Sequence, residues 1–84
     1  MKELIDLTID SLVKDSYNWT FSEYTADNTK TKISIWVGNG ILSYCFYKPC
    51  KLTIGLVDQL KIHRAIRKCK ANILINKLNE TIQE

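Results

Sequence analysis

The sequence lacks an apolar run of about 20 residues, the length that a membrane-spanning helix needs. It also lacks the opening pattern of a secretory signal, because acidic residues stand at Glu3 and Asp6, within the first turn. Its three cysteines are an odd number, which does not fit the paired disulfides of a small secreted domain. We therefore expect a cytoplasmic protein.

Catalytic signatures are nearly absent. The single histidine, His63, has no Ser, Cys or carboxylate beside it in a motif that activates a nucleophile. Gly38 and Gly40 belong to a predicted hairpin turn, so no glycine-rich phosphate loop remains. The side chains that offer zinc ligands are Cys45, Cys50, His63 and Cys69. They include no Cys-x₂-Cys pair, so we expect a non-enzymatic protein with no metal and no cofactor.

The size of the chain suits one small domain, and we expect residues 1–84 to form a single unit. A core of this size is marginal, so self-association would be a natural supplement. The charge is uneven, since residues 1–47 carry a net −2 and residues 48–84 carry +5. Abundant Ile, Lys, Asn and Thr are typical of AT-rich coding sequences, such as those of phages and mobile elements.

Residues 31–48 carry the central structural prediction, a β-hairpin that turns at Asn39-Gly40. This dipeptide tolerates positive φ at both turn positions. A two-residue loop places Ile35 opposite Tyr44 and gives the hairpin one apolar face, whereas an odd loop would mix apolar and polar positions. The apolar face comprises Ile33, Ile35, Val37, Leu42, Tyr44 and Phe46. The other face comprises Ser34, Trp36, Ser43, Cys45 and Tyr47.

Residues 3–15 are predicted to form an amphipathic helix. Its apolar positions are Leu4, Ile5, Ile9, Leu12 and Val13. Residues 19–25 are predicted to form the first strand, and residues 26–29 the turn that follows it. An odd loop would place Trp19 and Phe21 on the same sheet face as Ile33 and Ile35. The three strands then form an antiparallel meander.

Pro49 is expected to end the third strand, because proline cannot donate to a sheet ladder. We favour a helix capped by Thr53, and a short fourth strand within residues 52–56 is the alternative. A continuous helix over residues 54–81 would be about 40 Å long. A strand of about 6 residues spans only about 20 Å, so the helix should break near residues 70–72 or project.

Two apolar stripes run along this predicted helix. The first consists of Ile62, Ile66, Cys69 and Ile73. The second consists of Leu56, Leu60, Leu74 and Leu78. One stripe can pack on the sheet, and the other needs the first helix or another chain. The predicted fold is therefore α+β in the order α-β-β-β-α, with both helices on one face of the meander.

Three aromatic residues fall on the polar face of the meander, namely Tyr24, Trp36 and Tyr47. Exposed Trp and Tyr on a sheet are typical anchors of protein interfaces, and they also stack on nucleic-acid bases. We therefore predict a protein-binding module, in its concrete form a phage- or mobile-element-type inhibitor or regulator. Leu74 and Leu78 are the candidates for self-association as a homodimer.

The alternative function is a nucleic-acid-binding regulator. Its phosphate contacts would come from the basic residues of the long helix, namely Lys61, Arg64, Arg67, Lys68 and Lys70. Asp58 lies in line with these residues and weakens this alternative.

Overall fold

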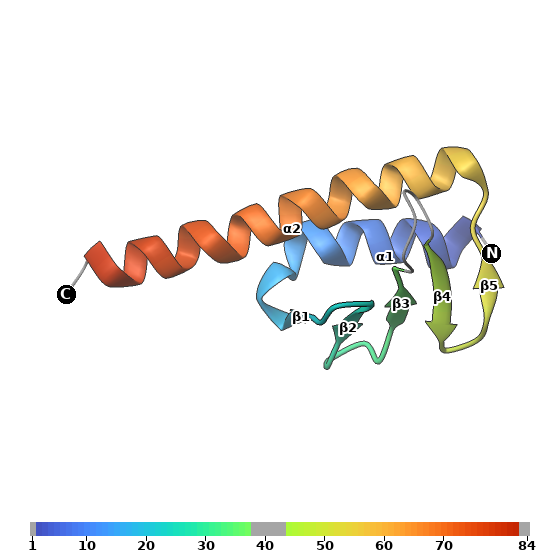
Figure 1. Ribbon diagram of the computed structural model, residues 1–84, viewed down its shortest axis with the longest axis horizontal. Coiled ribbons are helices and arrows are strands. Elements are labelled where there is room, and N and C mark those ends of the chain that lie inside the picture. Colours follow the sequence, from blue (N-terminus) through green and yellow to red (C-terminus); the bar gives the residue numbers. More distant parts are fainter. Residues whose placement is uncertain (1, 38–43, 83–84) are drawn as a thin grey trace.

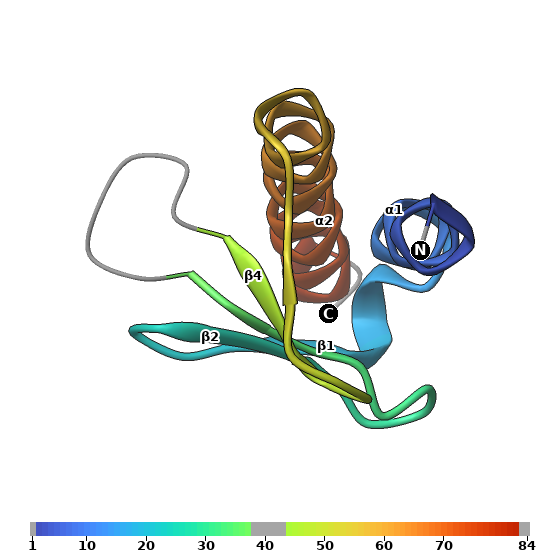
Figure 2. The same cartoon turned by 90° about the vertical axis from the view of Figure 1, so that its right-hand side faces the viewer.

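Two α-helices lie on one side of a five-stranded antiparallel sheet in the computed structural model, which describes residues 2–37 and 44–82 (Figures 1 and 2). The strands are ordered β1-β2-β3-β4-β5, so the sheet is a meander. The elements are α1 (Lys2–Lys14), the 3-10 helix η1 (Ser16–Asn18), β1 (Trp19–Phe21), β2 (Thr25–Asn28), β3 (Ser34–Trp36), β4 (Cys45–Lys48), β5 (Leu52–Thr53) and α2 (Leu56–Ile82). The predicted α+β class and the placement of both helices on one face are confirmed.

Helix α1 matches its predicted bounds closely, and its apolar residues meet the core as the spacing requires. Ile5 and Leu12 are buried, whereas Val13 is more exposed than predicted because it stands at the outer edge of the contact with α2. Two polar residues of α1, Thr8 and Ser11, are also buried. The Thr8 hydroxyl donates to the Leu4 carbonyl, so a polar residue enters the core with its hydrogen bond satisfied.

The β3–β4 hairpin has the predicted faces but not the predicted pairing. Ile35 pairs with Phe46 and Trp36 with Cys45, so the expected partnership of Ile35 with Tyr44 is wrong by two residues. At Ile35 and Trp36 this shift of two residues keeps each side chain on its own face, because the side-chain period of a strand is two. The register changes between Ser34 and Ile35, and Ser34 pairs with Lys48. The predicted turn at Asn39-Gly40 lies outside the described residues.

The first predicted strand is instead a hairpin of its own. The chain reverses after β1 in a tight turn, where the Ser22 amide donates to the Thr25 carbonyl at 2.9 Å. Most of residues 26–29, predicted as a turn, therefore belong to β2. This strand lies between β1 and β3, and Ala26 pairs with Phe21 on one side and Ile35 on the other. Ala26 is buried, so a small side chain suits the middle of the sheet under the helices.

The segment after β4 also differs from the favoured prediction. β4 ends at Lys48, just before Pro49, as expected. The favoured helix start at Thr53 is wrong, because Leu52 and Thr53 form β5 and pair with β4. α2 begins at Leu56, beyond Gly55. The alternative of a short fourth strand in this region is therefore correct for the two residues of β5.

Helix α2 runs without interruption over 27 residues, a length of about 40 Å. It lies beside α1, runs in the same direction and then extends past the rest of the protein (Figure 1). Of the two outcomes predicted for a long helix, projection is therefore the observed one. The first apolar stripe enters the core and the second is exposed. The exposed residues are Leu56, Leu60, Leu74 and Leu78.

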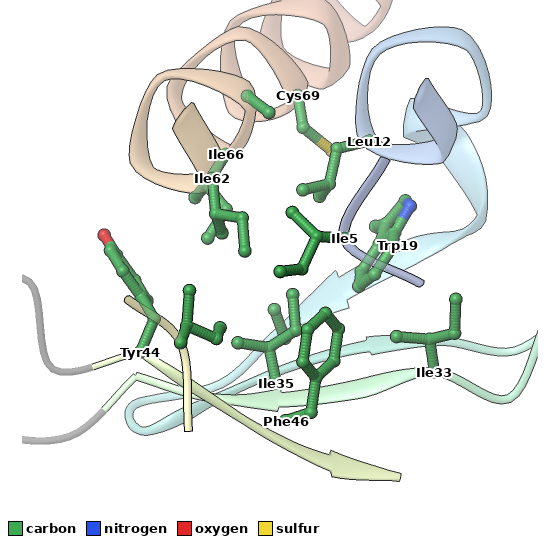
Figure 3. Packing of buried hydrophobic residues seen from close by; sticks show 13 residues of the cluster. Ile5, Leu12, Trp19, Ile33, Ile35, Tyr44, Phe46, Ile62, Ile66 and Cys69 are labelled. Atoms are coloured by element: carbon green, nitrogen blue, oxygen red, sulfur yellow. The ribbon is translucent and has the colours of Figure 1, made fainter. Parts of the chain in front are cut away.

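The core is formed between the two helices and the inner face of the sheet (Figure 3). The helical contributors include Ile5, Leu12, Ile62, Ile66 and Cys69, and the sheet contributors include Trp19, Ile33, Ile35, Tyr44 and Phe46. A buried hydroxyl joins the layers, because Ser11 Oγ accepts hydrogen bonds from Trp19 Nε1 and Asn28 Nδ2, both at 3.2 Å. These contacts hold one face of the sheet against the helices, so its other face points outward.

Candidate protein-binding face of the sheet

The outer face of the sheet is the candidate site, because in the described part of the chain both helices lie on the other side (Figure 2). Trp36 stands on this face in β3, the central strand, and 47% of its surface is exposed. Tyr24 and Tyr47, the two other predicted anchors, are also exposed. Strand alternation explains this placement, since Ile35 is buried on the inner face and its neighbour Trp36 must point outward.

Tyr24 and Trp36 form a stacked pair. Their ring centroids are 6.3 Å apart and their planes differ by 14°. The turn that carries Tyr24 is tied to the end of β3, because the Val37 amide donates to the Tyr24 carbonyl at 2.7 Å. This backbone hydrogen bond therefore holds the residues that carry the two rings next to each other.

A groove of about 390 Å³ opens beside Trp36. Its lining residues are Trp36, Cys45, Phe46, Tyr47, Lys51, Leu52 and Thr53. Tyr47 and Trp36 thus share one groove, while Tyr24 supports Trp36 from the stacked side. The residues from β5 were missed as site residues in the sequence. The signal for them was the alternative of a strand within residues 52–56.

The other half of this face is polar and internally hydrogen-bonded. Asp27 accepts from Ser34 Oγ at 2.5 Å and from Thr25 Oγ1 at 3.2 Å. Ser22 and Thr25 are hydrogen-bonded through their hydroxyls. The carboxylate is therefore already occupied by neighbouring donors, which leaves the aromatic half as the better anchor for a partner.

The basic residues predicted on α2 do not share one environment. Lys61, Arg64 and Lys68 line a second groove, of about 370 Å³, between α2 and α1. Asp6 from α1 lines the same groove, so the groove carries negative as well as positive charge. Lys70 faces elsewhere, with its Nζ 5.0 Å from the centroid of the Phe21 ring, a cation–π contact. Arg67 is exposed.

The two residues predicted for self-association lie near the C-terminal end of α2. Leu74 and Leu78 are both exposed, and Ile75, which the sequence analysis did not select, is exposed between them. The neighbouring Asn72 and Ile73 still touch the body, through hydrogen bonds and core packing respectively. This apolar group is therefore separate from the aromatic face of the sheet.

His63 is a structural partner of a buried tyrosine. Its Nδ1 lies 2.5 Å from the Tyr44 hydroxyl, and burial raises the pKa of Tyr44 above its usual value of 10.0. Gln59 also contacts Tyr44, by accepting from its backbone amide at 3.3 Å. These contacts attach the start of β4 to α2. They lie on the helix-covered side of the sheet, opposite the outer face.

The residues considered as zinc ligands are dispersed. Cys69 is buried and donates to the Ser16 carbonyl at 3.6 Å, and burial raises its pKa above the usual 9.0. Cys45 lies in the groove beside Trp36. Across residues 2–37 and 44–82, no three His, Cys, Asp or Glu side chains come together in a way that would hold a metal ion.

Comparisons with protein-family models, with curated proteins and with solved structures found no match. No described helix combines the length and the apolar character needed to cross a membrane.

Proposed function

We propose that this chain is a small, non-enzymatic, cytoplasmic protein-binding module that contacts its partner through the outer face of the sheet. Tyr24, Trp36 and Tyr47 are the anchors. The observation that carries this function is the exposed, stacked Tyr24–Trp36 pair on a sheet face that neither helix covers. A phage- or mobile-element-type inhibitor or regulator is the concrete form.

The energetics favour burial of this face by a partner. A Trp side chain is large, and burying its remaining apolar surface gains about 25 cal/mol per Å². Trp and Tyr are the residues most enriched among interface hot spots, particularly where neighbouring contacts exclude water. The groove beside Trp36 provides such a place, because a partner side chain inserted there would contact Trp36 and Tyr47 together.

Affinity capture from an extract of the cells that express the protein tests this function. The chain is immobilised as wild type and as Trp36→Ala, the extract is treated with nuclease, and bound proteins are quantified by mass spectrometry. A hot spot at Trp36 predicts that the variant loses at least about 2 kcal/mol of binding free energy, roughly thirtyfold in Kd. The purified partner is then titrated by calorimetry to measure that loss directly.

A tyrosine pair supplies the matched control. Tyr24→Ala removes the ring that stacks on Trp36 and should weaken the same partner. Tyr17→Ala removes an exposed ring from η1, outside the sheet, and should leave binding unchanged. Equal capture by wild type, Trp36→Ala and Tyr24→Ala would exclude the aromatic face as the binding site.

A nucleic-acid-binding regulator is the second candidate, supported by the grouping of Lys61, Arg64 and Lys68 along one groove. It predicts binding to duplex or single-stranded oligonucleotides that weakens steeply as salt is added. The double variant Lys61→Glu/Arg64→Glu should abolish that binding, whereas Lys70→Gln, at the Phe21 ring, should weaken it less. Fluorescence anisotropy at low ionic strength measures it, and absence of binding there removes this candidate.

A further inference from the structure

The two helices form a groove of their own, on the side of the molecule away from the outer face of the sheet. Two helices packed side by side leave a valley on each flank, and the core and the sheet fill one of these valleys (Figure 2). In the described part of the chain, the groove of about 370 Å³ is lined by residues of α1 and α2 alone. It is therefore the other valley, which the described residues leave open.

The floor of this groove is apolar. Ile9 and Val13 line it from α1, and Ala65 lines it from α2. Ala65 is buried, whereas Val13 is exposed. These three side chains carry no hydrogen-bonding group, and the backbone groups within both helices are bonded internally. A segment bound here must therefore supply apolar side chains and satisfy its own backbone hydrogen bonds, as an α-helix does.

The rim of the groove on α2 is basic. Lys61, Arg64 and Lys68 line it at positions i, i+3 and i+7, which fall on one flank of a helix. All three are exposed, and in the part of the chain that the structure describes none of them forms an ion pair. They extend along the groove over about 10 Å, at about 1.5 Å per residue. Acidic side chains on a partner would complement this rim.

The rim on α1 carries the opposite charge, at Asp6. Asp10 stands one turn further along α1 and is already paired with Lys14 at 3.1 Å. A nucleic-acid strand would bring its phosphates towards Asp6 and has no apolar side chains to place on the floor. A helical peptide can instead direct acids towards α2 and an apolar stripe towards the floor. The polarity of the groove therefore favours a peptide.

We propose that the groove between α1 and α2 is a docking site for an acidic amphipathic helix of a protein partner. The apolar stripe of that helix covers the floor, and its carboxylates pair with the three cations of the rim on α2. This site lies across the molecule from Trp36, so it is a second docking surface and does not rest on the function proposed for the outer face of the sheet.

Fluorescence anisotropy of a labelled synthetic peptide, titrated with the full chain, tests this site. The probe is a capped peptide of about 18 residues, long enough to form an isolated helix, with a stripe of Leu, a flank of Glu and Ala elsewhere. It should bind with a Kd of about 100 μM or tighter. A peptide with Gln in place of every Glu, and one with Ala in place of every Leu, should each bind at least about tenfold more weakly.

Two matched pairs of variants locate the binding. Arg64→Glu and Arg67→Glu make the same charge change on the same helix, but of the two only Arg64 lines the groove. Arg64→Glu should raise the Kd at least about tenfold, because it brings like charges together, and Arg67→Glu less than about threefold. On α1, Val13→Gln should weaken binding, whereas Leu7→Gln, at an exposed position outside the groove, should not. Circular dichroism confirms that all four variants are folded.

Absence of peptide binding to wild type, or equal losses in Arg64→Glu and Arg67→Glu, would overturn this docking site. An oligonucleotide that binds through Arg64 when the peptide does not would assign the groove to nucleic acid. A dimer of the chain alone that Arg64→Glu abolishes would assign it to a second copy. Trp36→Ala should bind the peptide like wild type, so failure here is distinguishable from failure of the function proposed for the sheet. Loss of peptide binding in Trp36→Ala would place the peptide on the sheet and would also overturn this site.

Discussion

The side-chain amide of Asn72 donates a hydrogen bond to Ser16 Oγ at 3.0 Å, joining two residues 56 positions apart in the chain. Ser16 Oγ in turn donates to the Leu12 carbonyl at 2.7 Å, at the end of α1. Cys69, one turn earlier on α2, donates to the Ser16 carbonyl. This cluster fastens α2 to η1 at the point where α2 begins to project.

Asn72→Ala should destabilise the protein by about 1 kcal/mol, because it removes the donor to Ser16 and Val13. Asn76→Ala is the matched control, one turn further along the same helix. Its side-chain amide donates to Glu80 at 3.3 Å in an exposed contact within the projecting end, so the expected change is below about 0.5 kcal/mol. Urea unfolding measures both, and equal changes would contradict a fastening role for Asn72.

Ile62→Ala should cost about 2–5 kcal/mol in the free energy of unfolding, because Ile62 is completely buried between the helices and the sheet. Leu60→Ala, two residues away on the exposed stripe, should cost less than about 1 kcal/mol. Chemical denaturation of the two variants compares the stripes directly. A loss at Leu60 as large as that at Ile62 would mean that the second stripe is covered in solution.

Trp36→Ala should leave the fold intact and lower the free energy of unfolding by only about 1 kcal/mol. An aromatic pair such as Tyr24–Trp36 typically contributes about this much. Trp19 is buried and serves as a contrast, since Trp19→Ala should cost about 3–5 kcal/mol. Circular dichroism and thermal unfolding distinguish the two. Global unfolding of Trp36→Ala would show that Trp36 is required for the stability of the sheet and is not primarily a binding residue.

Stability should fall as the pH rises above about 10, the ordinary pKa of tyrosine. Burial raises the pKa of Tyr44, so the folded state keeps a proton that the unfolded state releases. The protonated Tyr44 therefore stabilises the fold fully at pH values below its pKa in the unfolded chain. This stabilisation is lost as the pH rises through its pKa in the folded protein. Urea unfolding from about pH 8 to about pH 11 should show a shallower decline for Tyr44→Phe than for wild type.

Tyr17→Phe, at an exposed ring, controls for the loss of one tyrosine. Both variants retain Cys69, whose pKa is raised by burial. Cys69 therefore contributes equally in both to the decline of the free energy of unfolding with pH. The Tyr44 variant should also lose about 1 kcal/mol at neutral pH with its hydrogen bond to His63. Identical slopes in the two variants would mean that Tyr44 does not cause the decline.

Residue periodicity by itself determined which side chains face inward. Alternation in the hairpin separated buried Ile35 and Phe46 from exposed Trp36 and Tyr47, and helical spacing separated two apolar stripes on α2, one of which is buried. These assignments survive an error of two residues in strand pairing, because side-chain direction repeats every two residues. Trp36 and Tyr47 on the outer face were therefore predictable from the sequence, whereas Tyr24 was expected in a strand and lies in the turn between β1 and β2.

Only the tertiary structure decided how many strands the sheet has, how they pair and what surrounds Trp36. The reversal before β2 uses Glu23 and Tyr24, which carry none of the Gly or Asn signals of a tight hairpin. It is stabilised instead by pairing with β3 on the far side, a contact between distant residues. Likewise the Tyr24–Trp36 stack, the groove completed by β5 and the attachment of α2 to η1 through Asn72 all depend on long-range packing, which local residue preferences do not encode.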